Sequence, residues 1–248
     1  MRFNVINLPS RADRRAQFTA WNARPGVEFA FVDAAVGATL DRGELVAQNV
    51  ITADNAGFSA GALGCAMSHR ALWLAARDAA GPTLICEDDA CLRGDIAVQL
   101  QAALSQLRPD WHLCYLGYNT DAVVATQSDD GLKALLFFDE SAKRAPGYFD
   151  AFARLHAPTP TPLQCFQAWG TLAYIVSPTG AQRLLELCFP MRADTEVFMF
   201  GQNRTLKPFG IDGMINLALQ RAPLNAYCVT PPLVVGPNDT ATSDVVAR

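Results

Sequence analysis

The sequence predicts an α/β fold in which a mainly parallel sheet is flanked by helices. Three observations lead to this prediction: short β-rich apolar runs alternate with segments of helical spacing, residues that cap helices stand where those segments begin, and no internal repeat breaks the order. The 248 residues suffice for one such domain with a sizeable core. Because ligands bind beyond the carboxyl ends of strands in such sheets, the candidate site is expected at that edge.

In the first half of the chain, strands and helices are expected in turn. The predicted order is strand 3–8, helix 13–21, strand 27–32, helix 59–80, strand 83–86, helix 98–107 and strand 111–116. Ser59 is expected to cap the longest helix, which Gly81 and Pro82 stop. The expected apolar face of this helix consists of Leu63, Met67, Ala71 and Leu74.

The second half opens with residues 119–167, whose scattered prolines and polar residues predict long loops with little regular structure. Loops of that length in compact domains are often lids or binding loops. A strand over 171–176 is expected next, followed by a helix that Ser177 caps, with Pro178 at its first position. The last predicted elements are a helix over 213–220, capped by Asp212, and a strand over 226–230.

Composition and charge exclude several classes of protein. Charged residues make up 18% and apolar residues 50%, which disfavours disordered and coiled-coil chains. The net charge of −4, without a long basic run, disfavours a nucleic-acid partner. The 7 cysteines are odd in number and include no CxxC pair, so a reducing compartment is expected in place of disulfides or a zinc site. No apolar window approaches a signal peptide or a membrane span, which predicts a cytoplasmic protein.

The acidic cluster Glu87-Asp88-Asp89 directly follows a predicted buried strand. Adjacent carboxylates repel one another unless water or a cation neutralises them. Mg²⁺ or Mn²⁺ joins such carboxylates to substrate phosphates, and the metal then stabilises a diphosphate leaving group. The alternative is a solvated acidic turn that caps a short helix. The position at a strand end favours the metal site.

Basic and imidazole side chains are the next candidates. Arg11, Arg14 and Arg15 follow the first strand, where guanidinium groups can pair with phosphate; each alone is as well explained by a solvated helix face. His69 is predicted to lie away from the apolar face of its helix, where it is a catalyst or a structural hydrogen-bonding group. It is far in sequence from His112 and His156, which disfavours a metal site built from the histidines.

Asp212 opens a predicted helix and has two explanations. It can cap that helix, which contributes about 1 kcal/mol, or it can be the general base that takes a proton from an acceptor hydroxyl. One residue can do both. Asp194 and Glu196, on the preceding loop, are rivals for the role of base.

Several segments, in order along most of the chain, resemble one family. They are Val5-Ile6-Asn7-Leu8 with Arg14-Arg15, Gly64-Cys65-Ala66-Met67-Ser68-His69, Leu84-Ile85-Cys86-Glu87-Asp88-Asp89-Ala90, Tyr115-Leu116-Gly117, Gly170-Thr171-Leu172-Ala173-Tyr174, Gly180-Ala181 with Leu184-Leu185, Ile211-Asp212 and Pro231-Pro232-Leu233-Val234. The set resembles glycosyltransferase family 25, the bacterial lipopolysaccharide and lipooligosaccharide glycosyltransferases related to the collagen galactosyltransferases.

The resemblance implies a GT-A-like, Rossmann-type fold and inverting transfer of galactose or glucose from a UDP-sugar to a saccharide acceptor. It also implies at most peripheral contact with the inner membrane. Residues 1–118 are expected to bind the nucleotide sugar, and residues 119–248 to bind the acceptor and carry catalysis. The resemblance implies that Asp89 is the direct metal ligand, that Glu87 and Asp88 serve the ribose or a metal-bound water, and that His69 and Thr171 lie near the site. Together with the residues considered above, the expected site consists of metal ligands Asp89 and Asp88 for Mn²⁺ or Mg²⁺; donor contacts Asn7, Leu8, Arg11, Arg14, Glu87, Asp88 and Thr171; and catalytic residues Asp212 and His69.

Three departures from the family pattern bear on the acceptor side. Ala62 stands where the family often has an acidic residue, residues 121–162 match no family segment, and residues 191–208 resemble an insertion. Two other functions remain open: a non-catalytic relative that binds sugar nucleotides, and a nucleotidyltransferase. The absence of a GxxxxGK phosphate loop counts weakly against the latter.

Overall fold

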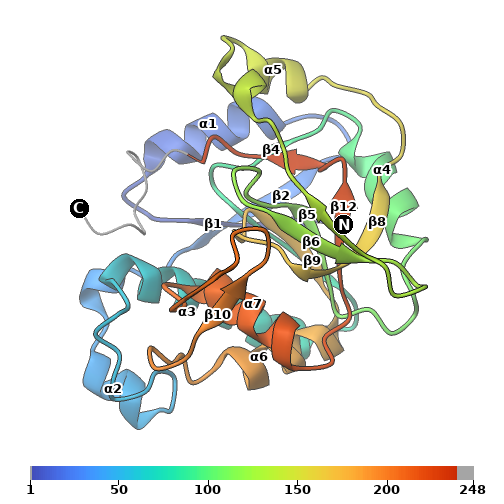
Figure 1. Ribbon diagram of the computed structural model, residues 1–248. Helices are drawn as coiled ribbons and strands as arrows, with labels where there is room; N and C mark the ends of the chain where they lie inside the picture. The colour runs from blue at the N-terminus through green and yellow to red at the C-terminus, as the bar shows by residue number, and fades with distance from the viewer. Residues whose placement is uncertain (1, 239–248) are drawn as a thin grey trace.

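The computed structural model describes residues 2–238, which form a sheet of nine strands with helices on both faces (Figure 1). From one edge to the other the strands are β2 (Glu28–Asp33), β1 (Arg2–Asn7), β3 (Thr83–Glu87), β9 (Ala173–Val176), β5 (Leu113–Gly117), β12 (Ala226–Thr230), β8 (Thr161–Gln167), β6 (Val124–Gln127) and β7 (Lys133–Leu136). The predicted α/β class with flanking helices is confirmed.

The remaining elements surround this sheet. The helices are α1 (Ala12–Asn22), α2 (Arg42–Ala47), α3 (Ala60–Arg77), α4 (Ile96–Leu104), α5 (Tyr148–Phe152), α6 (Pro178–Cys188) and α7 (Ile211–Arg221), with short 3-10 turns at Gly37–Thr39 and Ser141–Arg144. Two small ribbons pair β4 (Cys91–Leu92) with β13 (Val234–Val235), and β10 (Val197–Met199) with β11 (Arg204–Leu206). None of the described helices is long and apolar enough to cross a membrane.

The sheet is mixed in its strand directions. Three pairs are parallel: β1 with β2, β1 with β3, and β5 with β12. The buried strand β9 runs antiparallel between β3 and β5, so its first residue, Ala173, pairs with Cys86 and Gly117 at their carboxyl ends. The segment that leads into β9 therefore lies at the same edge as the ends of β1 and β3.

Side chains of the central strands alternate between two apolar cores, as the two-residue period of a strand requires. One core takes Ile85, Tyr115 and Tyr174 together with α3, α6 and α7. The other takes Leu84 and Leu116 together with α1 and α4. Figure 1 shows α1 above the sheet, and α3, α6 and α7 below it. The sheet is thus buried on both faces around β3, β9 and β5.

The predicted apolar face of α3 is confirmed at Leu63 alone: Met67 and Leu74 are half-buried, and Ala71 is exposed. The helix also buries Ala62, Ala66, His69, Trp73 and Ala76. Spacing of apolar residues pointed to the wrong face because the buried face is completed by a polar side chain, His69, whose hydrogen bond to the sheet compensates for its burial. The predicted cap is confirmed, since Ser59 Oγ accepts from the Ala62 N–H at 3.0 Å.

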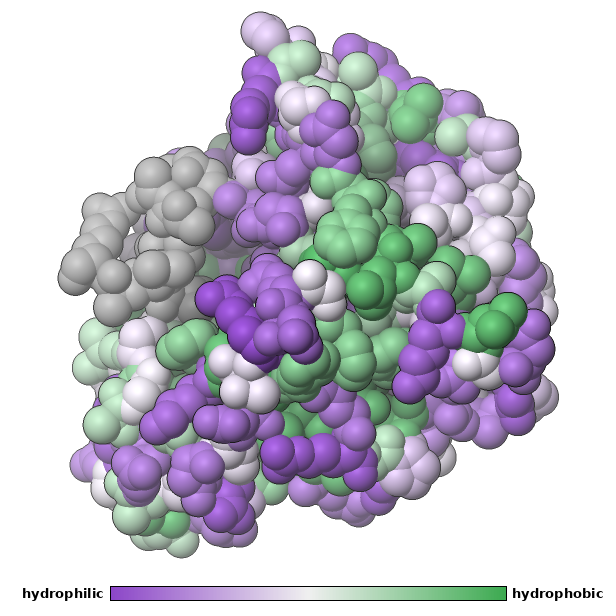
Figure 2. Space-filling view, viewed as in Figure 1, coloured by the Kyte–Doolittle hydropathy of each residue, from purple (hydrophilic) through white to green (hydrophobic). Residues whose placement is uncertain are grey.

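The prediction of unstructured loops over residues 119–167 is also wrong. This segment contains α5, the β6–β7 hairpin and β8, which pairs antiparallel with β12 and extends the sheet. Of the prolines that suggested loops, Pro158 and Pro160 precede β8 and Pro162 is its second residue, near the strand start where proline is tolerated. The edge strand β7 begins with the charged Lys133 and has an exposed Leu135; a charge on an edge strand limits its pairing with other chains. Figure 2 shows apolar side chains gathered over the region of β6, with polar side chains around them.

The two predicted helix starts in the second half differ in outcome. Ser177 caps α6 through the Gly180 N–H at 3.0 Å, with Pro178 at the first helical position, as predicted. Asp212 is not a cap, because α7 begins at Ile211 and Gly210 occupies the capping position. The Asp212 carboxylate instead accepts from the Gly213 N–H at 2.8 Å and from the Gly170 N–H at 3.3 Å. Asp212 is therefore held toward the segment before β9.

Candidate active site

A cavity of about 710 Å³ opens at the carboxyl ends of β1 and β3, a volume typical of small-molecule sites. Its walls come from the segments after β1 and β3, from α3, from the segment before β9 and from the start of α7. The predicted site residues that line it are Leu8, Arg14, His69, Glu87, Asp88, Asp89, Thr171 and Asp212. The fold thus gathers in one place residues that are up to 204 positions apart, from Leu8 to Asp212 (212 − 8 = 204).

Two other predicted donor residues lie outside the cavity lining. Asn7, the last residue of β1, is buried behind it and donates to Asp88. Arg11 pairs with Asp13, its Nη2 lying 2.9 Å from Oδ2 of that carboxylate. The predicted donor contact of Arg11 is therefore not supported, because the guanidinium reaches a neighbour in its own turn.

Asp88 ties the turn after β3 to the turn after β1. Its Oδ2 accepts from Asn7 Nδ2 at 2.8 Å, and its Oδ1 accepts from Arg14 Nη1 at 3.0 Å. Burial raises the pKa of Asp88 above its ordinary value, although the hydrogen bond from Asn7 and the charge of Arg14 oppose the rise. This bridge fixes Arg14 over the cavity. It also leaves Asp88 less free to bind a ligand than its neighbour Asp89.

Glu87 is held from two sides. Thr171 Oγ1 donates to Oε1 at 2.5 Å, and His69 Nε2 lies 3.7 Å from the same oxygen. Burial by itself would raise the pKa of Glu87, but the His69 imidazole, the Thr171 hydroxyl and the charge of Arg14 outweigh it, so the pKa lies below its ordinary value. The antiparallel entry of β9 brings Thr171 to this position, as the resemblance implied for a residue near the site.

A buried chain of hydrogen bonds orients His69. Trp73 Nε1–H can only donate, so Tyr174 Oη accepts from it at 2.8 Å and can donate its own hydrogen to His69 Nδ1 at 2.7 Å. In that arrangement the network assigns the proton of a neutral imidazole to Nε2, which faces Glu87. His69 therefore reaches the cavity as the end of a chain that starts in the core.

Asp89 differs from the other two acids. Its Oδ1 is buried and has no hydrogen-bond partner within residues 2–238. Burial, and then the negative charge of Glu87, raise the pKa of Asp89 to about 7. A buried carboxylate oxygen without a partner is costly unless something neutralises it. The oxygen donors present at this position fit a hard divalent cation.

Asp212 faces the cavity from α7, while the rival bases do not line it. Burial raises the pKa of Asp212, opposed by the Gly213 and Gly170 N–H groups and reinforced by the charge of Glu87. Asp194 is half-exposed and pairs with Arg192 at 3.1 Å, and Glu196 is likewise not among the lining residues. Of the three predicted candidates, Asp212 alone is placed to meet a substrate.

Sequence reasoning missed several residues of the cavity. Lys143 and Asp121 line it from the segment of residues 119–167, and Cys65 lines it from α3. Lys143 Nζ lies 3.1 Å from Glu140 Oε2 at the end of a short 3-10 turn. No local pattern marks Lys143 or Asp121, because only the pairing of β6 and β8 with the sheet brings their segment to the site. Cys65 lies inside a quoted motif, so the family pattern was the available signal.

The glycine of that motif has a packing role. A Cβ on Gly64 would lie 2.6 Å from the Ala35 carbonyl oxygen and 2.8 Å from the Gly37 nitrogen. Four residues on, Ser68 Oγ accepts from the Ala35 N–H at 2.9 Å. The absence of a side chain at Gly64 thus lets α3 approach the strip of backbone at residues 35–37, which forms one wall of the cavity.

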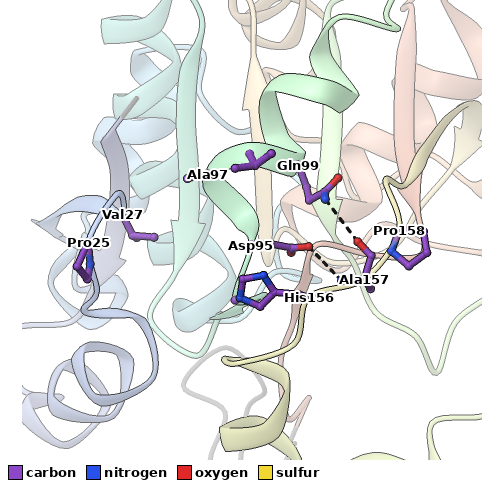
Figure 3. Close-up of a pocket in the computed structure, with 10 residues that line it drawn as sticks. Pro25, Val27, Asp95, Ala97, Gln99, His156, Ala157 and Pro158 are labelled. Carbon is purple, nitrogen blue, oxygen red and sulfur yellow. Dashed lines mark hydrogen bonds between the residues drawn. The ribbon is translucent and has the colours of Figure 1, made fainter.

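A second cavity, of about 560 Å³, lies near Pro25 and Pro158 (Figure 3). Its lining includes one carboxylate, Asp95, and that group is already engaged. Asp95 Oδ1 lies 2.7 Å from Arg93 Nε, and Asp95 Oδ2 accepts from the Ala157 N–H at 3.1 Å. The acidic cluster and most of the predicted site residues, among them Asp89 and Asp212 with their raised pKa values, line the first cavity, which is the candidate active site.

The comparisons with known proteins identify a family. The sequence model of the family described as glycosyltransferase family 25 (LPS biosynthesis protein) matches residues 1–199 of the 248. The match includes the acidic cluster and Thr171, and it ends before Asp212. A search of the curated proteins found no match. Since the family match covers well over half of the chain, this protein belongs to glycosyltransferase family 25.

Proposed function

We propose that this glycosyltransferase moves a hexose, galactose or glucose, from a UDP-sugar to a saccharide acceptor, with Mn²⁺ or Mg²⁺ bound at Asp89. One observation carries the proposal: the buried Oδ1 of Asp89, without a hydrogen-bond partner among the described residues, lies in the cavity at the carboxyl edge of the sheet. A divalent cation would neutralise this oxygen and its neighbours. When bound, it supplies a Lewis acid for the departing diphosphate.

The chain's own residues would prepare the donor side. The Asn7–Asp88–Arg14 bridge holds the Arg14 guanidinium over the cavity, where it can pair with a phosphate oxygen. Asp88 keeps further lone pairs on both oxygens for a metal or a metal-bound water. Glu87, ionised and held by Thr171, is available to a ribose hydroxyl. In this division Asp88 positions Arg14, Glu87 binds the nucleotide and Asp89 binds the metal.

The acceptor would enter from the side of α7 and residues 119–167. In a direct, inverting displacement a base must accept the proton of the attacking hydroxyl. We assign this role to Asp212, whose raised pKa brings it closer to the working pH than an ordinary aspartate. His69, whose Nε2 lies 3.7 Å from Glu87 Oε1, would face the donor beside that carboxylate.

Calorimetric titration of UDP with and without Mn²⁺ tests the proposal. Wild-type protein is expected to bind UDP with Mn²⁺ present, and Asp89→Asn is expected to weaken that binding by more than roughly 100-fold, because even outer partners of a metal ligand contribute 10–100-fold. Asp194→Asn, which alters an exposed carboxylate outside the cavity, is the matched control and should bind like wild type.

Three results would contradict this function. The absence of UDP binding under all of these conditions, with circular dichroism showing folded protein, would remove the UDP-sugar donor. Release of pyrophosphate in place of UDP during turnover would identify a nucleotidyltransferase. Metal-dependent UDP binding without turnover on a broad acceptor panel would identify a non-catalytic relative.

A further inference from the structure

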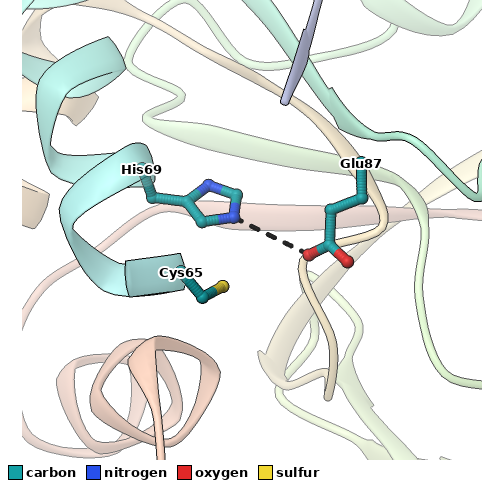
Figure 4. Close-up of side chains that lie close together, drawn as sticks. All are labelled: Cys65, His69 and Glu87. Carbon is teal, nitrogen blue, oxygen red and sulfur yellow. Dashed lines mark ion pairs between the residues drawn. The ribbon is translucent and has the colours of Figure 1, made fainter. Parts of the chain in front are cut away.

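Three potential metal ligands of different chemistry meet on one wall of the cavity (Figure 4). They are the Sγ of Cys65, an imidazole nitrogen of His69 and a carboxylate oxygen of Glu87, and all three atoms lie within 4.8 Å of one another. Cys65 and His69 are four residues apart on α3, so they share one face of the helix. Glu87 faces them from the end of β3, and Figure 4 shows the three side chains converging.

His69 supplies the observation that points to a ligand. Its side chain is completely buried, and its Nε2 has no hydrogen-bond partner within the described residues. Glu87 Oε1, at 3.7 Å, is beyond hydrogen-bonding distance. A buried ring nitrogen aimed at a thiol and a carboxylate, and bonded to neither, is in the position of an unsaturated ligand.

We propose that Cys65, His69 and Glu87 form a zinc site, separate from the Asp89 site and selective for a softer metal. Sulfur and imidazole ligands favour Zn²⁺ over Mg²⁺ and Mn²⁺, which prefer oxygen. Three protein ligands with a fourth position open to a cavity is the arrangement in which zinc keeps a water or a substrate atom. The proposal goes beyond the transferase function and shares with it one residue, Glu87, which has a second carboxylate oxygen left for the donor.

To bind zinc, the three ligand atoms must move slightly closer together. Zinc–ligand bonds of about 2.0–2.3 Å place the ligand atoms of a tetrahedral site roughly 3.3–3.8 Å apart. The His69–Glu87 distance of 3.7 Å already fits, so the closure falls on the Cys65 side chain. The other six cysteines are buried in the structure, and Cys65 alone is partly exposed, so its thiol is the one that can reach the cavity.

The proton balance is simple. Binding releases one proton, from the Cys65 thiol, which becomes a thiolate ligand. His69 stays neutral while its ring proton moves from Nε2 to Nδ1. The Tyr174 oxygen, with two lone pairs, can then accept from both His69 Nδ1–H and Trp73 Nε1–H, at 2.7 and 2.8 Å. Such a hydrogen bond to the second ring nitrogen is the usual support of a zinc-bound histidine.

Cobalt(II) as a spectroscopic substitute for zinc tests the proposal on the full chain without UDP or acceptor. One equivalent of Co²⁺ is expected to give a thiolate-to-metal charge-transfer band that Zn²⁺ abolishes by displacement. Cys65→Ser should remove the band and weaken Co²⁺ binding at least tenfold. His69→Gln is a second variant for the same loss, and circular dichroism checks that both proteins are folded.

Asp89→Asn is the matched control, because it alters the hard-metal ligand and leaves the three proposed ligands in place. It should keep the band while losing Mn²⁺-dependent UDP binding, so failure of either site is seen independently of the other. A wild-type protein without the band, or a band that survives in a folded Cys65→Ser variant, would overturn the zinc site. Loss of the band in Asp89→Asn would show that the two sites are not separate.

Discussion

Asp212→Asn is expected to lower kcat by roughly 10²–10⁴-fold while leaving the affinity for UDP nearly unchanged. The amide keeps the size of the carboxylate, and its oxygen can still accept from the Gly170 N–H, which lies 3.3 Å from Oδ2 in the native site. It cannot take a proton from an acceptor hydroxyl. Steady-state kinetics with the donor and acceptor, combined with calorimetric titration of UDP, separate the two effects.

The pH dependence of the same reaction gives an independent check. A base must be ionised to act, so kcat is expected to fall as the pH falls through the pKa of Asp212, which burial raises above its ordinary value. Saturating Mn²⁺ keeps Asp89 ionised during this measurement, and Asp212→Asn should lack this acid limb. Retained turnover in Asp212→Asn would move the assignment to Asp121, another carboxylate in the cavity lining.

Asp95→Asn is expected to cost about 3–5 kcal/mol of unfolding free energy, because it leaves Arg93 as an unpaired buried charge. The Arg93 and Asp95 side chains are 1% and 7% exposed and lie 2.7 Å apart. Urea denaturation measures the loss. Arg192 and Asp194 offer a matched control, since they have the same Arg-x-Asp spacing but are 51% and 52% exposed. Asp194→Asn should change stability by no more than about 0.5 kcal/mol.

The contribution of Asp95 should also depend on pH in a defined direction. Burial opposes ionisation of Asp95, but the hydrogen bonds and charge of Arg93 and the Ala157 N–H outweigh it, so its folded pKa is lowered. A lowered folded pKa gives stability that is complete above the unfolded value of about 3.9 and is lost as the pH falls through the folded value. The difference between wild type and Asp95→Asn should therefore shrink at acidic pH. An unchanged difference there would contradict the ion pair as its source.

Local sequence was sufficient to locate the acidic cluster of the candidate site. Glu87-Asp88-Asp89 follows a short apolar run after a Gly-Pro turn, which favours a buried strand that ends at the acids, as β3 does. The first strand and its arginines obey the same rule. Because parallel strands end at a common edge, the proximity of Arg14 and Asp88 could be expected before any contact was seen.

Other features depend on contacts that no local pattern records. The direction of β9 is set by its neighbours β3 and β5, which are 86 and 56 residues before it in the chain (173 − 87 = 86; 173 − 117 = 56). The buried face of α3 includes His69 because its ring is hydrogen-bonded to the hydroxyl of Tyr174, which lies on β9. Apolar spacing cannot detect a polar residue that a distant partner makes compatible with the core.

The reversed direction of β9 allows one side of the cavity to change during evolution while the other side stays fixed. Residues 119–167 leave from the end of β5 and return to the start of β9, and both points lie at the cavity. The strands that this segment adds, β8, β6 and β7, attach beyond β12, at the far side of the sheet from β1. A new sequence there can reshape the side of the cavity that holds Asp121 and Lys143 while the β1–β3–β9 framework under Asp89 stays in register. Under the proposed function, specificity for the acceptor can thus diversify between relatives while the strands that carry the acidic cluster stay the same.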